Sequence, residues 1–577
     1  PLPQTAAATS NYVYNGPNNQ DNTRWDFRID QILSDKQNVY FRYSAQNLDN
    51  GVTSALPPLN GNYYTGGGAQ NSVVKSFVLV HNKVWSPTLV SSVHVGWNYL
   101  SWINVFPDQS LRGLGIPGVT EKYPGFSQLA ITGYPTLGVS NVPNSDASQN
   151  RQLTADLTWT KGSHTVKFGT QLFWLQTNFL SSQRSSGIFS FNGQYTKNAF
   201  ADFLLGGASS ASLSSWSYLA LRDPYAHFFV QDDWKISRRL TLNFGLRYEL
   251  SPPAIQKNDT IANFDLDSNP ARPVLVQAGS AGSDRASRSL LGVNNLQFAP
   301  RFGFAYSLDR KTVIRGGYGI FYSNVITLGG QQSMETNPPN NLRVSLTTDK
   351  TKPPTIVLSQ GFAANALNLS NASNVTLISW DRNSVPPTAQ QWNLDVQREL
   401  PGGVLFEAGY YANKFDHNWR QIDGNPAAPI AGNINANRRY TSTIMQGVPI
   451  TLADVVREQK DGYSRYNGLQ VKLEKRFAKG LTFIASYAYS KTMALGDTAG
   501  TQDARNWRAD RAISSLDMTQ HFVGSAVYQL PFGRGKQFGS QWNGALNNVL
   551  GGWSLGPIIT VNTGMPLNLS VNGNPSN

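Results

Sequence analysis

The stretch from Leu240 to Leu250 alternates strictly between two kinds of side chain. Its even-numbered positions are all apolar or aromatic, and its odd-numbered positions are all polar or glycine. Because successive side chains of a β-strand point to opposite faces, this pattern predicts a strand with one oily face and one charged face. Strands of this kind need two different surroundings, one apolar and one wet, and this need constrains the fold more than any other feature of the sequence.

The same alternation recurs in pairs of segments along the chain. Most of these segments run for roughly 10–13 residues, which exceeds the five or six of an ordinary strand and suits a tilted strand that crosses a membrane. The pattern predicts about sixteen strands. The predicted pairs are residues 25–29 and 39–43, 73–85 and 89–104, 151–161 and 163–179, 224–236 and 239–251, 298–308 and 311–323, 389–399 and 403–414, 465–477 and 480–491, and 519–530 and 553–563.

The connections between the predicted strands alternate in length. Turns inside a pair are short, whereas links between pairs are long, and long loops without structure are uncommon in compact soluble domains. Short turns on one rim and long loops on the other are typical of outer-membrane barrels. We therefore predict an all-β fold, an antiparallel transmembrane β-barrel with short periplasmic turns and long extracellular loops. The long links are residues 45–72, 105–150, 180–223, 252–297, 324–388, 415–464 and 492–518.

In this barrel the oily face meets lipid and the charged face meets water. Closure satisfies every backbone group between strands, as the hydrocarbon region requires. Asp232 falls on the oily parity of its strand beside a short turn, so we expect it near the rim of the barrel. The alternative is a soluble antiparallel sandwich or propeller, but the pairs recur at uneven spacing and share no motif, unlike the blades of a propeller.

Composition narrows the possible functions. The chain has 577 residues and no cysteine, which removes disulfide frameworks, thiolate zinc sites and cysteine nucleophiles. No apolar run approaches the roughly 18 residues of a membrane helix. The net charge of +13 raises nucleic acid as a partner. However, lysine and arginine are scattered along the chain rather than clustered, so we predict no nucleic-acid partner.

Several segments resemble the barrel of TonB-dependent outer-membrane receptors. They are most similar to the Oar-like receptors that carry a carboxypeptidase-regulatory-like N-terminal domain and occur in Acidobacteria-type genomes. The resemblance spans about Asn11 to Leu569, and it rests on the order of many moderately specific pieces. These are Tyr225–Lys235, Leu240–Glu249, Phe298–Tyr306, Val313–Tyr322, Gln390–Leu394, Val396–Leu400, Ala485–Lys491, Leu530–Gly535 and Gly552–Ser554.

The resemblance implies a barrel of about 22 strands around a plug. The family's plug and TonB-contacting motif lie upstream of its barrel, and neither is found here. Gly573–Asn577 follows a predicted strand, where the family would continue to a terminal aromatic residue. We therefore expect residues 1–577 to be one barrel domain truncated at both ends, without the plug and the N-terminal domain. The expected partners are outer-membrane lipid, an unknown transported ligand, and the TonB–ExbB–ExbD energy complex through the missing plug.

The sequence shows no catalytic constellation and predicts no cofactor and no metal. Gly316–Gly319 resembles a phosphate loop but lies inside a predicted strand with no helix after it, which favours a strand packed closely on its neighbours. Asp265–Asn269 weakly resembles a calcium loop, yet it lacks the invariant glycine and the distal glutamate. The six histidines are dispersed, without the close spacing of metal ligands.

Aromatic residues in the predicted long loops are the only candidates for ligand contact. Such rings stack on sugars or cyclic ligands, but they also pack loops together or rest on the interfacial girdle. The four candidates are Trp216, Tyr218, Trp419 and Trp507.

We expect ligand-gated uptake, or export, of a large solute without covalent chemistry, and therefore not an enzyme. For the family as a whole, siderophores, glycan fragments, peptides and exported proteins are the cargoes to weigh. A passive porin-like or surface-binding barrel is the main alternative, and an upstream plug would exclude it. A soluble secreted β-rich adhesin is a third hypothesis, which recovery in the soluble fraction without detergent would favour.

Overall fold

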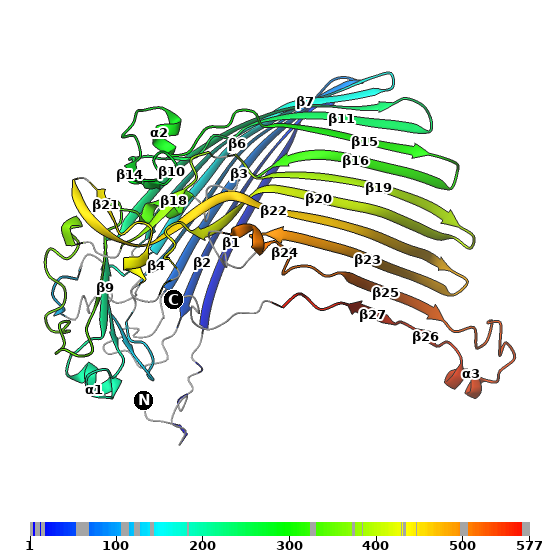
Figure 1. The fold of residues 1–577 in the computed structure, drawn as a ribbon. Helices are drawn as coiled ribbons and strands as arrows, with labels where there is room; N and C mark the ends of the chain where they lie inside the picture. The colour runs from blue at the N-terminus through cyan, green and yellow to red at the C-terminus, as the bar shows by residue number, and fades with distance from the viewer. Residues whose placement is uncertain are drawn as a thin grey trace.

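The computed structural model describes residues 4–5, 12, 15, 18–52, 69–105, 115–119, 127–138, 144–181, 184–323, 331–371, 375–383, 385–428, 430, 434–445, 447–496 and 506–567. One large curved sheet of 21 strands dominates this part of the chain (Figure 1). None of the helices in the described part of the chain has the length and apolar character needed to cross a membrane.

The predicted hairpins form the sheet, and each long strand pairs antiparallel with the next one along the chain. This confirms the all-β antiparallel architecture and the order of the sixteen predicted strands. Within the described residues, no hydrogen bonds join the two outermost strands. The order is β1 (Asn18–Ser34), β2 (Gln37–Val52), β3 (Ala69–Ser86), β4 (Leu89–Val105), β6 (Asn144–Lys161), β7 (His164–Ser181), β10 (Ser217–Lys235), β11 (Leu240–Leu250), β15 (Phe298–Ser307), β16 (Thr312–Tyr322), β19 (Thr388–Leu400), β20 (Val404–Asp423), β22 (Val448–Ala478), β23 (Leu481–Leu495), β25 (Gln520–Gln529) and β27 (Ile558–Asn562).

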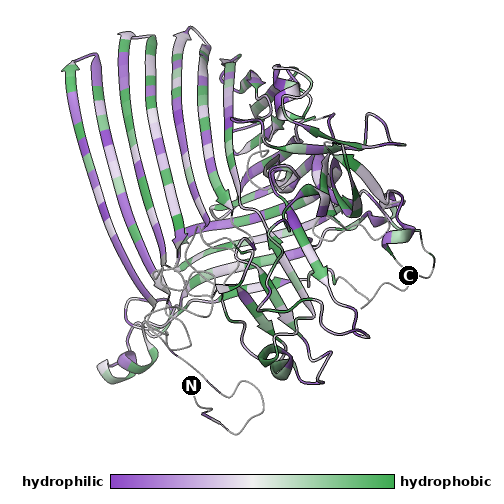
Figure 2. Ribbon diagram, turned by 90° about the vertical axis from the view of Figure 1, so that its left-hand side faces the viewer, coloured by the Kyte–Doolittle hydropathy of each residue, from purple (hydrophilic) through white to green (hydrophobic). Residues whose placement is uncertain are grey.

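The register of β11 confirms the two-faced pattern. Hydrophilic and hydrophobic residues alternate along the long strands of the sheet (Figure 2). Phe244 and Leu246 are exposed at 43% and 44%, whereas the Glu249 side chain, on the opposite parity, is 9% exposed and pairs with Arg247. We call the side of the sheet that carries Phe244 and Leu246 the apolar face, and the side that carries Arg247 and Glu249 the polar face. Exposed apolar side chains on a membrane strand are expected where lipid replaces water.

Asp232 lies three positions before the end of β10, next to a short turn, as predicted. It stands opposite Phe244 of β11 and Val166 of β7, so it shares the parity of the apolar face. Its carboxylate lies 2.7 Å from the Nδ1 atom of His164, the first residue of β7. A charge on the apolar face is therefore confined to the rim, where it costs little.

The predicted strand lengths were wrong at the loop end of the sheet. β22 runs for 31 residues and β20 for 20, so both extend far into the predicted link at residues 415–464. The cause is physical: strand pairing continues beyond the lipid zone, where no apolar surroundings impose alternation on the sequence. β2, β3, β6 and β10 extend into their links in the same way.

The long links are not structureless, and their segments form a folded layer at one end of the sheet (Figure 1). We call this part of the molecule the loop layer. It contains a four-stranded sheet, a two-stranded sheet and a strand that pairs parallel with β22. Its elements are β5 (Gln128–Ile131), β8 (Ile188–Phe191), α1 (Ala199–Leu204), β9 (Ser210–Ser214), β12 (Ile255–Gln256), β13 (Ala262–Asp265), β14 (Val274–Gln277), α2 (Arg285–Ser289), η3 (Gln331–Thr336), β17 (Arg343–Thr347), η4 (Leu369–Asn371), β18 (Val375–Trp380), η5 (Asn435–Asn437), β21 (Ser442–Met445), η6 (Trp507–Asp510) and β24 (Ala512–Ile513).

At the other end of the sheet the connections are short turns, apart from the link between β25 and β27. That link carries α3 (Gly544–Leu550) and β26 (Ser554–Leu555). Because long loops face the cell exterior in outer-membrane barrels, the loop layer corresponds to the extracellular side.

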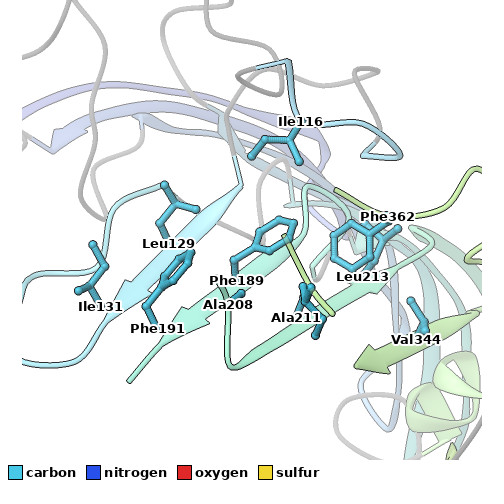
Figure 3. Packing of buried hydrophobic residues seen from close by; sticks show 11 residues of the cluster. Ile116, Leu129, Ile131, Phe189, Phe191, Ala208, Ala211, Leu213, Val344 and Phe362 are labelled. Atoms are coloured by element: carbon cyan, nitrogen blue, oxygen red, sulfur yellow. The ribbon is translucent and has the colours of Figure 1, made fainter. Parts of the chain in front are cut away.

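The buried hydrophobic clusters of the described residues lie mainly in the loop layer. One of them packs Phe189 of β8 against Phe362, with ring centres 5.0 Å apart, while Phe191 of the same strand lies beside Ile131 and Leu129 of β5 (Figure 3). Two more clusters surround Trp380 and Phe264. The loop layer therefore has cores of its own, while the strands below it present their apolar side chains outward.

Two loop segments cross closely at Gly118 and Gly361. Both residues have positive φ, +76° and +58°, and the amide of Phe362 donates a hydrogen bond to the carbonyl of Pro117 at 2.9 Å. A Cβ atom on Gly361 would lie 2.1 Å from the Pro117 carbonyl oxygen. Only glycine fits a positive φ together with such a close backbone approach.

We expect Gly361→Ala to loosen the cluster around Phe189. The positive φ alone costs about 1–3 kcal/mol for a residue with a side chain, and the clash adds to it. Limited proteolysis of intact cells should then cut the loop layer faster. Gly115→Ala is the matched control, because Gly115 also has a positive φ of +68° but nothing lies within 4 Å of its added Cβ. Equal effects of the two changes would show that the crossing contributes nothing.

Candidate functional site

Two of the aromatic candidates, Trp216 and Tyr218, lie at the start of β10. Tyr218 is the second residue of β10, stands opposite Leu180 of β7 and is 43% exposed. Trp216 is half-buried between β9 and β10. They occupy the edge between the large sheet and the loop layer, and their contact with a ligand stays a prediction.

The other two candidates, Trp419 and Trp507, each pack against a cation, and they are linked through the adjacent β20 residues Trp419 and Arg420; we call these two contacts together the Trp419–Trp507 cluster. Trp419 belongs to β20, and its ring centre lies 4.2 Å from that of Trp380. The Nζ atom of Lys460 lies 4.4 Å from the centre of the Trp419 ring. The guanidinium of Arg420, next to Trp419 in the chain, lies 4.7 Å from the centre of the Trp507 ring. Arg420 of β20 and Trp507 of η6 (Trp507–Asp510) are thus brought into contact although they lie far apart in the chain.

Charge pairing holds this cluster in place. Arg420 donates to Asp461 through Nε at 3.0 Å and Nη2 at 2.8 Å, a bidentate geometry that fixes the plane of the guanidinium. The Arg420 side chain is 3% exposed, so the interaction with the Trp507 ring is largely shielded from water. Trp507 is therefore half-buried, and its ring lies against a guanidinium whose orientation is fixed by Asp461.

Trp419 has a packing role in addition to any role in binding. Its ring packs against the buried cluster around Leu219, Leu221 and Met334. Its indole nitrogen is buried and has no hydrogen-bond partner in the part of the chain that the structure describes. The sequence left two roles open for these rings, stacking on a ligand and packing of the loops. For Trp419 the observed contacts are those of packing.

Sequence reasoning missed Trp380, Arg420 and Lys460, which complete the cluster. Trp380 is fully buried and Lys460 is 5% exposed. Trp380 lies within a predicted loop that forms β18, and Lys460 lies within one that forms part of β22. No local pattern signalled these contacts, because each joins residues from different segments: Arg420 to Trp507, Lys460 to Trp419 and Trp380 to Trp419.

The weak calcium motif is a turn closed by arginines. Asp265 accepts hydrogen bonds from the amides of Asp267 and Ser268 and from Arg382 at 2.9 Å, and Asp267 pairs with Arg457 at 2.5 Å. Burial raises the pKa of Asp265, but the bonds from Ser268, Asp267 and Arg382 outweigh it and hold the pKa below its ordinary value. The carboxylates of Asp265 and Asp267 are therefore already paired with arginine side chains of the protein.

The glycine motif Gly316–Gly319 lies in the middle of β16, as predicted. A Cβ atom on Gly316 would lie 2.5 Å from the ring of Phe304 on the neighbouring strand. The glycines therefore make room for packed neighbours within the sheet. Across the described ranges, no group of three or more histidine, aspartate or glutamate side chains is arranged to hold a metal ion.

Comparison with known proteins identifies the family. The sequence model of the family described as "Outer membrane beta barrel domain" matches residues 1–577. No curated protein matches the chain.

Several solved structures match this chain at low sequence identity. They include the siderophore receptor PirA from Acinetobacter baumannii, with 11% identity, a TM-score of 0.46, and 91% of this chain and 58% of that chain covered. The alcaligin receptor FauA from Bordetella pertussis has 9% identity and a TM-score of 0.43, with 89% of this chain and 58% of that chain covered. The ferripyoverdine receptor of Pseudomonas aeruginosa has 9% identity and a TM-score of 0.46, with 89% of this chain and 52% of that chain covered.

The chain spans little more than half the length of these receptors. Because the family model covers residues 1–577, the chain belongs to the outer membrane beta-barrel domain family and is a protein of the bacterial outer membrane.

Proposed function

We propose that this chain forms the barrel of a TonB-dependent transporter of the Oar-like type, which moves a large solute across the outer membrane by ligand-gated uptake or export. The observation that carries the proposal is the loop layer. Its buried clusters and its ion pairs make a preformed surface above the sheet, where a ligand from outside arrives first. The resemblance of the Tyr225–Lys235 segment and its companions to TonB-dependent receptors supports the same function.

Transport of this kind needs no covalent chemistry, so we propose that the protein is not an enzyme. The loop layer binds the solute, and the TonB–ExbB–ExbD complex supplies the energy through a plug domain. Trp507 is the aromatic contact that we favour for the ligand, because Arg420 holds its ring in place while part of it stays accessible. Trp216 and Tyr218 are the second choice, since Tyr218 is exposed beside the loop layer.

Energy-dependent uptake is the test of this function. The full-length protein would be expressed in a Gram-negative host, with ferric siderophores and labelled oligosaccharides as probes. We expect uptake of at least one probe to stop when the proton gradient of the inner membrane is dissipated. Uptake that continues without the gradient would instead support a passive porin-like barrel.

The role of Trp507 is tested in the same assay. Trp507→Ala should weaken the apparent affinity for the transported probe by about 0.5–1.5 kcal/mol, the usual worth of an aromatic stacking contact. Trp553→Ala is the matched control, because Trp553 is also exposed but lies in the link between β25 and β27, at the opposite end of the sheet. An equal loss of apparent affinity in both variants would show that Trp507 does not contact the ligand.

A further inference from the structure

A cavity of about 360 Å³ lies where the loop ends of β7 and β10 meet β9, β17, β18 and η3. Its lining is rich in serine and threonine hydroxyl groups, and its charged or ionisable members are Arg184, Arg343 and Glu335. The volume falls in the range of small-ligand sites. The cavity is distinct from the cluster of Trp419 and Trp507, none of whose residues lines it.

Glu335 is a buried carboxyl group without a partner. It belongs to η3, is 5% exposed, and its Oε2 atom has no hydrogen bond within the described residues. No lysine or arginine of the described residues forms an ion pair with it. Burial raises the pKa of Glu335 to about 8, so the neutral, hydrogen-bond-donating form dominates at neutral pH. A buried polar group left unpaired costs free energy, which a ligand that accepts its hydrogen bond would recover.

Arg184 provides the second unpaired group. Its φ is +59°, a conformation that side-chain-bearing residues rarely adopt, and its carbonyl accepts hydrogen bonds from the amides of Gly187 and Ser214. Burial lowers the pKa of Arg184, because the guanidinium is partly removed from water. In the described ranges no carboxylate pairs with this guanidinium. The backbone is thus held in a costly conformation, and the partly desolvated guanidinium lines the cavity.

We propose that this cavity binds the carboxylate or phosphate group of a polar solute, with the guanidinium of Arg184 as the principal cation and the Glu335 carboxyl as a hydrogen-bond donor. Arg343 adds a second positive charge on the same wall. Guanidinium groups bind both kinds of oxyanion in a bidentate manner, so the shared chemistry is the planar or tetrahedral oxyanion. The inference rests on the proposed transport function and names the chemical class of its ligand.

Binding of acetate and inorganic phosphate to the purified full-length protein in detergent, measured by calorimetry, tests the site directly. We expect at least one of the two anions to bind, with chloride at equal ionic strength as the background. Preference for acetate identifies a carboxylate ligand, and preference for phosphate identifies a phosphate ligand. No binding of either anion up to about 0.1 M, which covers millimolar affinities, would overturn the proposal.

Substitution of Arg184 locates the binding. Arg184→Gln should weaken the anion by about tenfold or more, because a charge-assisted bidentate contact is lost. Arg184→Lys keeps the charge without the planar fork and should give an intermediate loss; it also serves if the glutamine variant fails to fold. Arg272→Gln is the matched control, since Arg272 is an exposed arginine of the loop layer outside the cavity. Wild-type affinity in both Arg184 variants would overturn the proposal.

Glu335 gives the site a pH dependence of known sign. The other charged groups that line the cavity are Arg184 and Arg343, and the remaining lining residues carry no charge. Acetate stays ionised from about pH 6.5 to 9.5, whereas Glu335 ionises within this interval and then repels the anion. Wild-type affinity for acetate should therefore fall by about tenfold as the pH rises. Glu335→Gln should keep the affinity measured at low pH and make it constant.

A competing arrangement predicts the opposite behaviour of this variant. If Glu335 were ionised and paired with Arg184 in solution, Glu335→Gln would free the cation and raise the affinity for acetate already at about pH 6.5. That result would overturn the assignment of Glu335 as a donor. These measurements do not involve transport, so a failure to bind oxyanions leaves energy-dependent uptake standing, and a failure of uptake leaves the binding site standing.

Discussion

Replacing Leu246 with lysine is expected to destabilise the folded protein by about 2–4 kcal/mol, the cost of a lysine at the middle of an outer-membrane bilayer. Leu246 lies on the apolar face of β11, between Val230 of β10 and Pro300 of β15, and 44% of it is exposed. The nearest carboxylate on that face is Asp232, opposite Phe244, and it is already paired with His164. The free energy of unfolding of the full-length protein in phospholipid vesicles, from denaturant titration, measures the loss.

The same substitution at Leu240 shows whether the cost depends on the depth of the lysine in the membrane or only on the change of side chain. Leu240 is the first residue of β11 and has the parity of Leu246, but it adjoins the short turn. With a rise of about 3.3 Å per residue and a strand tilt near 40°, the two positions differ in depth by about 15 Å. Leu240→Lys should therefore cost only about 0–1 kcal/mol. Equal costs at the two positions would mean that the apolar face of β11 does not meet lipid.

The large sheet could be predicted from the sequence because lipid imposes a local rule on every strand. In β11, each residue from Leu240 to Leu250 reports by its own chemistry which face it occupies, and the turn beside Asp232 marks where the rule ends. The pattern needs no knowledge of distant residues. Where strands leave the lipid, as in the first half of β22, alternation no longer reports the structure, and the predicted boundaries failed there.

The loop layer could not be predicted because its contacts are distant and follow no period. Arg343 of β17 pairs with Ser214 of β9 across more than a hundred residues, and both strands are too short to display alternation. β18 runs parallel to β22, and no short turn joins the two strands, so the sequence does not indicate that they pair. The aromatic candidates show the same limit, because the sequence identified Trp419 and Trp507 but could not name their partners, Trp380 and Arg420.

Replacing Trp380 with alanine is expected to destabilise the loop layer by about 3–5 kcal/mol, the usual cost of removing a large aromatic side chain from a core. Trp380 is fully buried, and its Nε1 atom donates a hydrogen bond to the Ser333 hydroxyl at 2.9 Å. Its backbone exchanges two hydrogen bonds with the Asn263 side chain, at 2.7 and 3.0 Å. The side chain of Trp380 thus joins η3 to Trp419 of β20, while its backbone holds β13.

Hydrogen exchange of the protein in detergent distinguishes this loss from a failure of the whole sheet. In Trp380→Ala, the amides around Ile261, Leu291 and Met334, which share the cluster, should lose protection, because their opening free energy falls with the local core. The amides in the middle of β11 and β15 should keep theirs, since lipid or detergent and strand pairing hold them independently of the loop layer. Trp380→Phe, which retains most of the ring packing and loses the bond to Ser333, should show a smaller effect of about 1–2 kcal/mol. Uniform loss of protection over sheet and loops would show instead that the two parts fold as one cooperative unit, and the loop layer would then be no independent platform for a ligand.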